Sequence, residues 1–459
     1  MMPRLVVLMR RATPRAALLL ALASLVAAQP AAAQSVLRDA ETEAVLADIS
    51  RPIIAAAGPS VAGTKVVLLQ DKEINAFVAG GQIIYVHSGL ITAADNANQV
   101  QGVIAHELGH ITGGHIIRFG EGAKAAGGIS ILSLLLGAAA IAAGGAEAGM
   151  GILGAGQQAA MSKFLSFSRT QESSADAAGA SFLTKAGISG KGSVAFFQKL
   201  RQQEYRLSSS YANTDPYAQT HPMSADRAEM LEGVYRKSAA WDAKTDPQLE
   251  ARFQRVKAKL AGFVDDPTTT MRKYPTTDNS VPAHYARAYA WHKSAYPERA
   301  LTEVNALLAT APHDPYFLEL KGQVLLESGK PAEAVAPLRE AVQRTNAPLI
   351  AATFGHALIA TEDTRNFVEA QKVLRTAVQR DEDNPFAWYQ LGIVYAQEGD
   401  IARAALATAM RYNLQGNPRM ALGQAETALR GIPEGTPDYL RAEDIAIASR
   451  AEIATQKKR

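Results

Sequence analysis

His106 and His110 are the residues whose spacing first suggests chemistry. They are four positions apart, so on a helix their side chains project from the same side of consecutive turns. Glu107 lies beside His106 and completes the pattern His-Glu-x-x-His, in which two imidazoles bind zinc and a carboxylate lies next to a metal-bound water. The pattern is short and also arises by chance. It therefore predicts a catalytic zinc site only if the chain supplies a third ligand.

A catalytic zinc ion takes three protein ligands and keeps one position for water. A histidine six residues after His110 would give the metzincin pattern, but that position is Ile116. His115 falls on a different face of the helix, and we expect it to be a helix-end or surface histidine. Because the chain has no cysteine, the third ligand should be a carboxylate or an imidazole from another helix.

Glu172 is the best candidate for that ligand. It lies at the start of a helix that we expect from residue 168 to about residue 185. Asp176 follows four positions later on the same face, where it could hydrogen-bond the second ring nitrogen of a ligating histidine and fix its tautomer. The alternative for Glu172 is an exposed glutamate that the positive end of the helix dipole favours.

The histidine pair needs other elements to position it. We expect helices at 36–57 and 100–117, where apolar residues recur at helical spacing. The β-branched runs at 65–70 and 82–87 predict two strands, and the glycines at 80–81 predict a turn before the second of them. We expect these two strands to pair antiparallel.

A strand beside an active-site helix could also hold substrate. An exposed strand edge can pair with an extended peptide and lay its scissile bond along the metal. This makes Ile83, Ile84 and Tyr85 candidate substrate-binding residues. An ordinary strand with no such role is the alternative.

The first 33 residues have the pattern of a secretory signal peptide. Arginines precede a short apolar run at 16–28, and small residues at 31–33 offer a cleavage site before Gln34. An uncleaved anchor is the alternative. With no cysteine, the exported chain needs no oxidative folding, and we expect it in a bacterial periplasm. The net charge of +3 over 459 residues gives no reason to expect nucleic acid as a partner.

Residues 125–146 carry no charge and are rich in glycine and alanine. Their length would suffice to cross a membrane. Three interpretations stay open: an apolar lid or helical hairpin over the site within 125–160, a segment that contacts or spans a membrane, and a buried core helix.

The C-terminal part of the chain predicts helical repeats. Residues 241–280 have the composition of a linker. From 281 to 455 the glycines Gly322, Gly355 and Gly392 recur at spacings of 33 and 37 residues, within patterns that follow the tetratricopeptide signature. We expect four or five helix pairs stacked into a solenoid, which would present a surface for binding proteins or peptides. A generic helical bundle is the alternative.

Three motifs in order carry a family resemblance. HELGH at 106–110, ESSAD at 172–176 and HPMSADR at 221–227 resemble the gluzincin peptidases related to HtpX and the CAAX-prenyl endopeptidases. The resemblance extends over nearly the whole mature chain, because an exported form with C-terminal tetratricopeptide repeats is similar to periplasmic members that act as proteases and chaperones. It implies a zincin-like domain at 34–240 in a mainly α (α+β) fold.

The resemblance also implies a set of roles. One zinc ion per chain would be bound by His106, His110 and Glu172, with Glu107 as general base. His221 and Arg227 of the third motif would lie near the site and stabilise the oxyanion. His221 could instead occupy the fourth position on zinc and hold the enzyme latent.

These observations predict an exported zinc endopeptidase whose repeats bind misfolded or stalled outer-membrane proteins and their assembly machinery. A rival hypothesis is a chaperone or assembly factor whose metal site is mostly closed. A third is a membrane-embedded peptidase that enters the membrane through residues 125–146.

Overall fold

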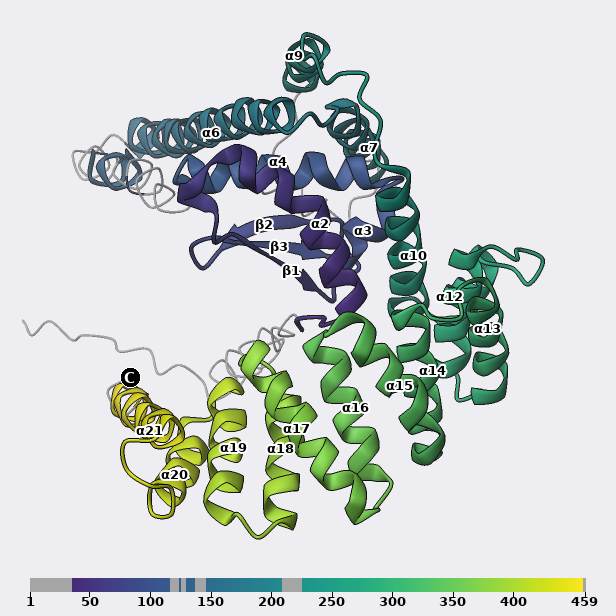
Figure 1. The fold of residues 1–459 in the computed structure, drawn as a ribbon. Helices are drawn as coiled ribbons and strands as arrows, with labels where there is room; N and C mark the ends of the chain where they lie inside the picture. The colour runs from purple at the N-terminus through teal and green to yellow at the C-terminus, as the bar shows by residue number, and fades with distance from the viewer. Residues whose placement is uncertain (1–34, 116–123, 125–128, 137–145, 209–224, 457–459) are drawn as a thin grey trace, which may run out of the picture. The chain divides into compact units, whose positions relative to one another are not determined.

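The computed structural model describes residues 35–115, 124, 129–136, 146–208 and 225–456 (Figure 1). The signal peptide expected at 1–33, the candidate site residue His221 and much of 125–146 lie outside these residues. The described chain is mainly helical with one small sheet, which confirms the fold class expected from the sequence.

The sheet has the strand order β1-β3-β2, where β1 is Lys65–Leu69, β2 is Ala76–Ala79 and β3 is Ile83–His87. β3 pairs parallel with β1 and antiparallel with β2. The antiparallel pairing expected between residues 65–70 and 82–87 is therefore wrong. The reason is that β2 lies between them in sequence and reverses the chain once more, so the two longer strands run in the same direction.

The first helix begins later than the sequence suggests. α2 spans Ala40–Ala57, and Asp39 caps it by accepting a hydrogen bond from the backbone N–H of Thr42. The preceding residues extend the sheet instead, because Val36 pairs antiparallel with Leu69. A 3₁₀ turn at Pro59–Val61 then leads into β1.

One hydrophobic core holds the site helix in place. α4 (Ala97–Thr112) packs against the sheet, α2, α6 and α7, and α3 (Ser88–Ala93) leads into it from β3 (Figure 1). α7 spans Lys191–Ser208, and α9 (Ala225–Arg236) packs on α6 and α7. Fully buried side chains from several of these elements meet in the core, among them Ile49, Ile84, Ile104 and Phe196.

α6 is one continuous helix from Ala146 to Lys185. The helix start that we expected at residue 168 is therefore wrong, and Glu172 lies well inside a helix. No proline interrupts this stretch, and its many alanines favour a helix throughout. Among the described residues, no helix is both long enough and apolar enough to cross a membrane.

Residues 241–280, which have a linker composition, hold two helices. α10 is Pro247–Val264 and α11 is Pro267–Lys273. Phe253, Val256 and Leu260 of α10 lie in the same buried core as α4. α10 also packs on α12, so it joins the N-terminal domain to the repeats through packed side chains.

Five helix pairs follow in the described residues 281–456, which confirms the expected solenoid. Eight of these ten helices have a proline at their first or second position, where the missing N–H needs no partner. Their bounds are α12 Val281–Lys293, α13 Pro297–Thr310, α14 Pro315–Glu327, α15 Pro331–Thr345, α16 Pro348–Ala360, α17 Thr364–Arg380, α18 Pro385–Gln397, α19 Ile401–Leu414, α20 Pro418–Leu429 and α21 Pro437–Gln456.

A buried group of charges ties α10 to α2 and to the repeats. Lys259 is 3% exposed, and its Nζ lies 2.5 Å from Oδ2 of Asp39. Arg255 forms ion pairs with Glu41, at 2.5 Å, and with Asp314 at the start of α14, at 2.7 Å. Buried charges need such partners, because an unpaired charge would lose its hydration without compensation.

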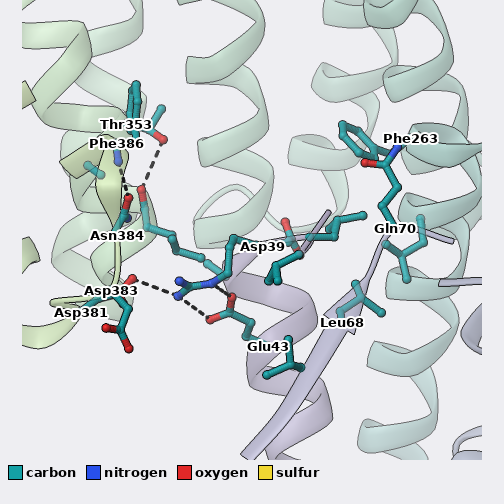
Figure 2. A pocket seen from close by; sticks show the side chains of 18 of the residues that line it. Asp39, Glu43, Leu68, Gln70, Phe263, Thr353, Asp381, Asp383, Asn384 and Phe386 are labelled. Carbon is teal, nitrogen blue, oxygen red and sulfur yellow. Dashed lines mark hydrogen bonds and ion pairs between the residues drawn. The ribbon is translucent and has the colours of Figure 1, made fainter. Parts of the chain in front are cut away.

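A cavity of about 1250 Å³ lies where β1 and the start of α2 meet the repeats (Figure 2). Repeat residues such as Thr353 and Phe386 line one side of it, and Leu68 lines the other. Arg38 reaches across, with Nη2 at 2.9 Å from Oδ2 of Asp381. The cavity thus has walls from both the N-terminal domain and the repeats.

Candidate metal centre

Helix α4 carries both histidines of the His-Glu-x-x-His pattern. Asn96 caps its N-terminus by accepting a hydrogen bond of 3.0 Å from the backbone N–H of Gln99. The backbone N–H of Ala97 donates to the carboxylate of Glu250 in α10, at 2.9 Å. Residues 97–110 are all buried, so the helix and its histidines are held on every side.

Small residues let α6 approach α4 closely. A Cβ added to Gly109 would lie 2.5 Å from the carbonyl oxygen of Ala175, and one added to Gly179 would lie 3.0 Å from the backbone of Ala105. A side chain at either position would push the helices apart. The two glycines therefore permit the contact that brings Glu172 to the histidines.

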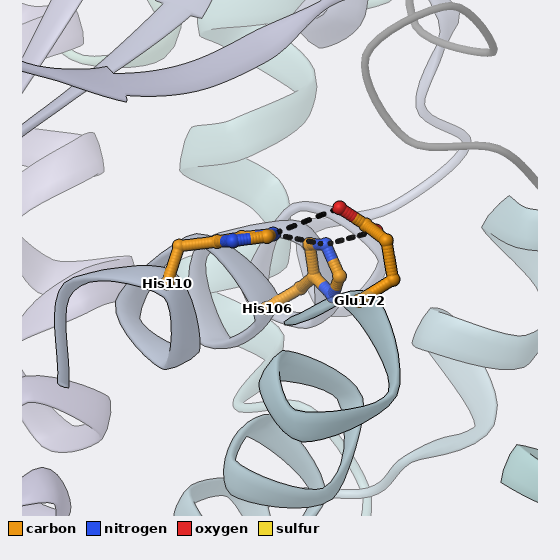
Figure 3. A group of neighbouring side chains, drawn as sticks. All are labelled: His106, His110 and Glu172. Carbon is orange, nitrogen blue, oxygen red and sulfur yellow. Dashed lines mark hydrogen bonds and ion pairs between the residues drawn. The ribbon is translucent and has the colours of Figure 1, made fainter. Parts of the chain in front are cut away.

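His106, His110 and Glu172 converge on one point (Figure 3). The Nε2 atoms of the two histidines are 3.1 Å apart. Oε2 of Glu172 lies 3.4 Å from Nε2 of His106, and Oε1 lies 3.4 Å from Nε2 of His110. All three side chains are buried. The structure brings together the three residues that the sequence suggested as metal ligands.

This geometry fits a tetrahedral metal ion. Bonds of about 2.0–2.2 Å place the ligand atoms of a tetrahedral zinc ion roughly 3.3–3.6 Å from each other. The separations between the three donor atoms are 3.1 and 3.4 Å, so little movement would be needed to bind zinc. Two imidazoles and one carboxylate also leave a fourth position for water, as in catalytic zinc sites.

Asp176 orients the first histidine. Its Oδ1 lies 2.8 Å from Nδ1 of His106, and it is 4% exposed. Burial disfavours the charged ring, but hydrogen bonds and charges from Asp176 and Glu172 outweigh it and raise the pKa of His106 to about 10. A carboxylate at Nδ1 leaves Nε2 directed at the metal position. Phe197 of α7 packs edge-on against the same ring at 6.0 Å between centroids.

His115 lies beside the second histidine, and the expectation of a surface histidine is wrong. It is 6% exposed, and its Nδ1 lies 2.9 Å from Nδ1 of His110. α4 ends at Thr112, and Gly114 with φ of 63° turns the chain back toward the helix. His115 therefore contacts His110 as Asp176 contacts His106. Helical spacing alone could not reveal this, because the residue lies beyond the turn that ends the helix.

The structure describes the remaining candidate residues of the site to different extents. Glu107 is 1% exposed on α4, next to His106. His221 lies outside the described residues. Arg227 lies in α9, which packs on α6 and α7, while its side chain lies outside what the structure describes.

β3 cannot offer the free edge that the sequence suggested for Ile83, Ile84 and Tyr85. It is the central strand, and its residues pair with β1 on one side and with β2 on the other. Ile84 is fully buried. The strand at the edge of the sheet that also contacts α4 is β2. This correction follows from the strand order, which places β3 between two strands.

Comparison with known proteins supports the metallopeptidase interpretation. Residues 37–234 match the model of peptidase family M48, and residues 295–348 and 360–418 match tetratricopeptide repeats. The matched peptidase segment contains the whole candidate metal centre.

Several bacterial proteases are similar to this chain. The beta-barrel assembly-enhancing protease of Yersinia pestis is 24% identical over 384 residues, which cover 82% of this chain and 76% of that protein. The protein of the same name from Escherichia coli strain K12 is 24% identical over 386 residues, with the same coverage. Metalloprotease LoiP of E. coli strain K12 is 32% identical over 167 residues, which cover 35% of this chain and 58% of LoiP. The chain therefore carries a peptidase domain of family M48 followed by tetratricopeptide repeats, and it is a metalloprotease.

Proposed function

We propose that this metalloprotease is a zinc-dependent endopeptidase that is exported to the periplasm and acts in quality control and assembly of outer-membrane proteins. The observation that supports the chemistry is the convergence of His106, His110 and Glu172, with Glu107 beside them on α4. The signal peptide predicted at 1–33 supports export.

His106, His110 and Glu172 would hold the zinc ion. When bound, zinc would lower the pKa of a water molecule and polarise the scissile carbonyl. Glu107 accepts the proton of the attacking water and delivers it to the leaving amine. Asp176 keeps Nε2 of His106 available as a ligand by holding Nδ1. His221 and Arg227 of the third motif remain our candidates for stabilising the oxyanion.

Substrate would be held as an added strand. β2 lies at the edge of the sheet and contacts α4, so an extended peptide could pair with Ala76–Ala79 beside the metal position. Backbone pairing depends little on side chains, so it suits an enzyme that acts on unfolded chains of varied sequence.

The repeats would bind the partner proteins. Tetratricopeptide arrays bind proteins or peptides on their surfaces, and two relatives of the whole chain are named beta-barrel assembly-enhancing proteases. We infer that the cavity next to Phe386 and Thr353 takes part in this binding, since it opens between repeat helices and the sheet.

Glu107→Gln tests the peptidase proposal. The amide keeps the size of the side chain and cannot accept a proton, so cleavage of an unfolded outer-membrane protein should fall by at least a hundredfold. Zinc content should remain one ion per catalytic site. A variant that retains zinc and cleaves at the wild-type rate would overturn the mechanism.

The rival chaperone function calls for a test in the full-length chain, because Tyr285 of α12 donates a hydrogen bond to Glu41 of α2 and a truncation near residue 280 would remove it. Phe386→Asp places a charge in the cavity and leaves the metal centre unchanged. If the Glu107→Gln protein restores outer-membrane assembly in a null strain and the Phe386→Asp protein does not, binding by the repeats is the main function. If the Phe386→Asp protein restores assembly and the Glu107→Gln protein does not, proteolysis is the main function.

A further inference from the structure

A second group of side chains that could hold a metal ion lies at the C-terminal end of β3. Asp71 and Glu73 belong to the loop between β1 and β2, and His87 is the last residue of β3. Each offers one ligand atom, and these atoms all lie within 4.8 Å of one another. The cluster shares no residue with the centre formed by His106, His110 and Glu172.

The loop that carries the two carboxylates is held rigidly. The carbonyl oxygen of Asp71 accepts hydrogen bonds from the backbone N–H of Gly89, at 2.8 Å, and from Oγ of Ser88, at 2.7 Å. The backbone N–H of His87 donates to the carbonyl oxygen of Asn75, at 3.0 Å. The loop is thus fixed at both ends onto the junction of β3 and α3.

Gly89 shows how closely the loop packs on this junction. A Cβ at that position would lie 2.2 Å from the carbonyl oxygen of Lys72. Glycine is therefore required for the approach of the loop. The carboxylate of Asp71 is oriented as well, because its Oδ1 accepts a hydrogen bond of 2.9 Å from the backbone N–H of Glu73.

His87 is the observation that points to a ligand. It is 1% exposed, and neither of its ring nitrogens lies within hydrogen-bond distance of a partner among the described residues, although the backbone of Glu73 lies near enough to act on the ring. Buried polar atoms normally have partners, since leaving one unsatisfied costs about 1–3 kcal/mol. The Nδ1 atom lies 3.7 Å from Oδ2 of Asp71, beyond hydrogen-bond distance and close to the separation of two ligands on one ion.

The ring of His87 is held in one orientation. Phe77 of β2 packs edge-on against it, with 5.9 Å between the ring centroids.

We propose that Asp71, Glu73 and His87 bind a second divalent transition-metal ion, with zinc as the representative ion. An imidazole with two carboxylates suits zinc or manganese better than calcium, which prefers oxygen ligands throughout. Asp71 and His87 need little movement, and Glu73 is exposed and can rotate to close the set. The ion would fasten the β1–β2 loop to the start of α3 and would bind a ring nitrogen of His87.

Metal stoichiometry in the full-length protein tests this site. After equilibration with zinc and removal of the free ion, the wild type should hold two zinc ions per chain by elemental analysis. Glu73→Gln should hold one, and Glu172→Gln should also hold one, retained at the second site. Glu73 is exposed, so its replacement should not disturb folding. The matched control Glu443→Gln, an exposed carboxylate on α21, should hold two.

A second readout separates the two sites. Competition with a chelating dye should show that Glu73→Gln weakens one of two zinc affinities by at least tenfold and leaves the other unchanged. Anomalous scattering at the zinc edge should give a peak beside His87. A Glu73→Gln protein that keeps both ions, or a wild type with one ion that Glu172→Gln loses entirely, would overturn the second site. The latter result would leave the catalytic proposal standing.

Discussion

Oδ1 of Asp176 lies 2.8 Å from Nδ1 of His106, and one helical turn before Asp176 the same helix presents Glu172 to Nε2 of that histidine. A single face of α6 thus contacts both ring nitrogens of one imidazole. One carboxylate faces the metal position, and the other fixes the orientation of the ring. Such pairs strengthen metal binding because the ligand is already oriented before the ion arrives.

Asp176→Asn should weaken zinc binding by about 10–100-fold while leaving the fold intact. The amide can still hydrogen-bond Nδ1 of His106 but lacks the charge that favours the required tautomer. Zinc affinity should be measured by chelator competition. Asp242→Asn, at an exposed carboxylate that pairs with Lys191, is the control and should leave affinity unchanged. Equal affinities in the wild type and Asp176→Asn would contradict this role.

Gly109→Ala should destabilise the peptidase domain by about 1–3 kcal/mol, because the new methyl group would meet the carbonyl oxygen of Ala175. Separation of α4 and α6 should also weaken zinc binding. Calorimetry and metal titration measure the two effects.

Gly154→Ala, on helix α6, is the control for Gly109→Ala on α4. Nothing lies within 4 Å of a Cβ at Gly154, so alanine there should be neutral or stabilise the helix by up to about 1 kcal/mol. If both substitutions had the same effect, close packing of α4 and α6 would not explain the need for glycine at 109.

Lys259→Met should lower stability by about 3–5 kcal/mol, because it would leave the carboxylates of Asp39 and Glu41 buried with less compensation. The control is Lys330→Met, which removes an exposed pair with Glu298 and should cost at most about 1 kcal/mol. Urea unfolding followed by tryptophan fluorescence compares the two. A similar shift of the urea midpoint in both variants would show that the buried ion pair contributes no more to stability than the exposed one.

Glu319 should make stability depend on pH. Burial raises its pKa to about 8, with a lowering effect of Lys259 and raising effects of Asp39 and Glu41. Between the usual glutamate pKa and about 8, the folded chain holds a proton that the unfolded chain has lost. Stability should therefore fall as pH rises through this window, and the loss should be complete above about pH 8.

Glu319→Gln should remove that pH dependence. We expect the variant to exceed the wild type by about 2 kcal/mol at pH 9, less than the full pKa shift would give because the side chain is only partly buried. Melting temperatures between pH 5 and pH 9 test this. Glu333→Gln, at an exposed carboxylate of the next helix, should keep the wild-type slope. A Glu319→Gln protein with an unchanged slope would assign the dependence to another group.

Local spacing accounts for what the sequence revealed of the candidate site. His106 and His110 share a helix face by their separation of four, and so do Glu172 and Asp176. That these two faces meet depends on glycine and alanine at the contact, which the motifs themselves contain. The repeats were predictable for a similar reason, since each helix pair reuses the same small residues at the same positions.

Long-range pairing accounts for the errors. The order β1-β3-β2 depends on β2, which has only four residues and gave no strand signal of its own. His115 reaches His110 because Gly114 adopts positive φ after the helix ends, and a helical projection takes no account of such a turn. The second cluster was missed because its three residues belong to a loop and a strand end, where no periodic spacing relates them.

Because α6 is continuous, a movement at one end of the helix would also move the other end. Its 40 residues span about 60 Å at the usual rise per residue. Exposed apolar side chains occupy the first half, including Met150 and Met161, while Glu172 lies in the second half. One continuous helix therefore connects the exposed apolar side chains to Glu172. A force that tilted its apolar end would move Glu172 relative to the two histidines and change how well the three residues hold a metal ion.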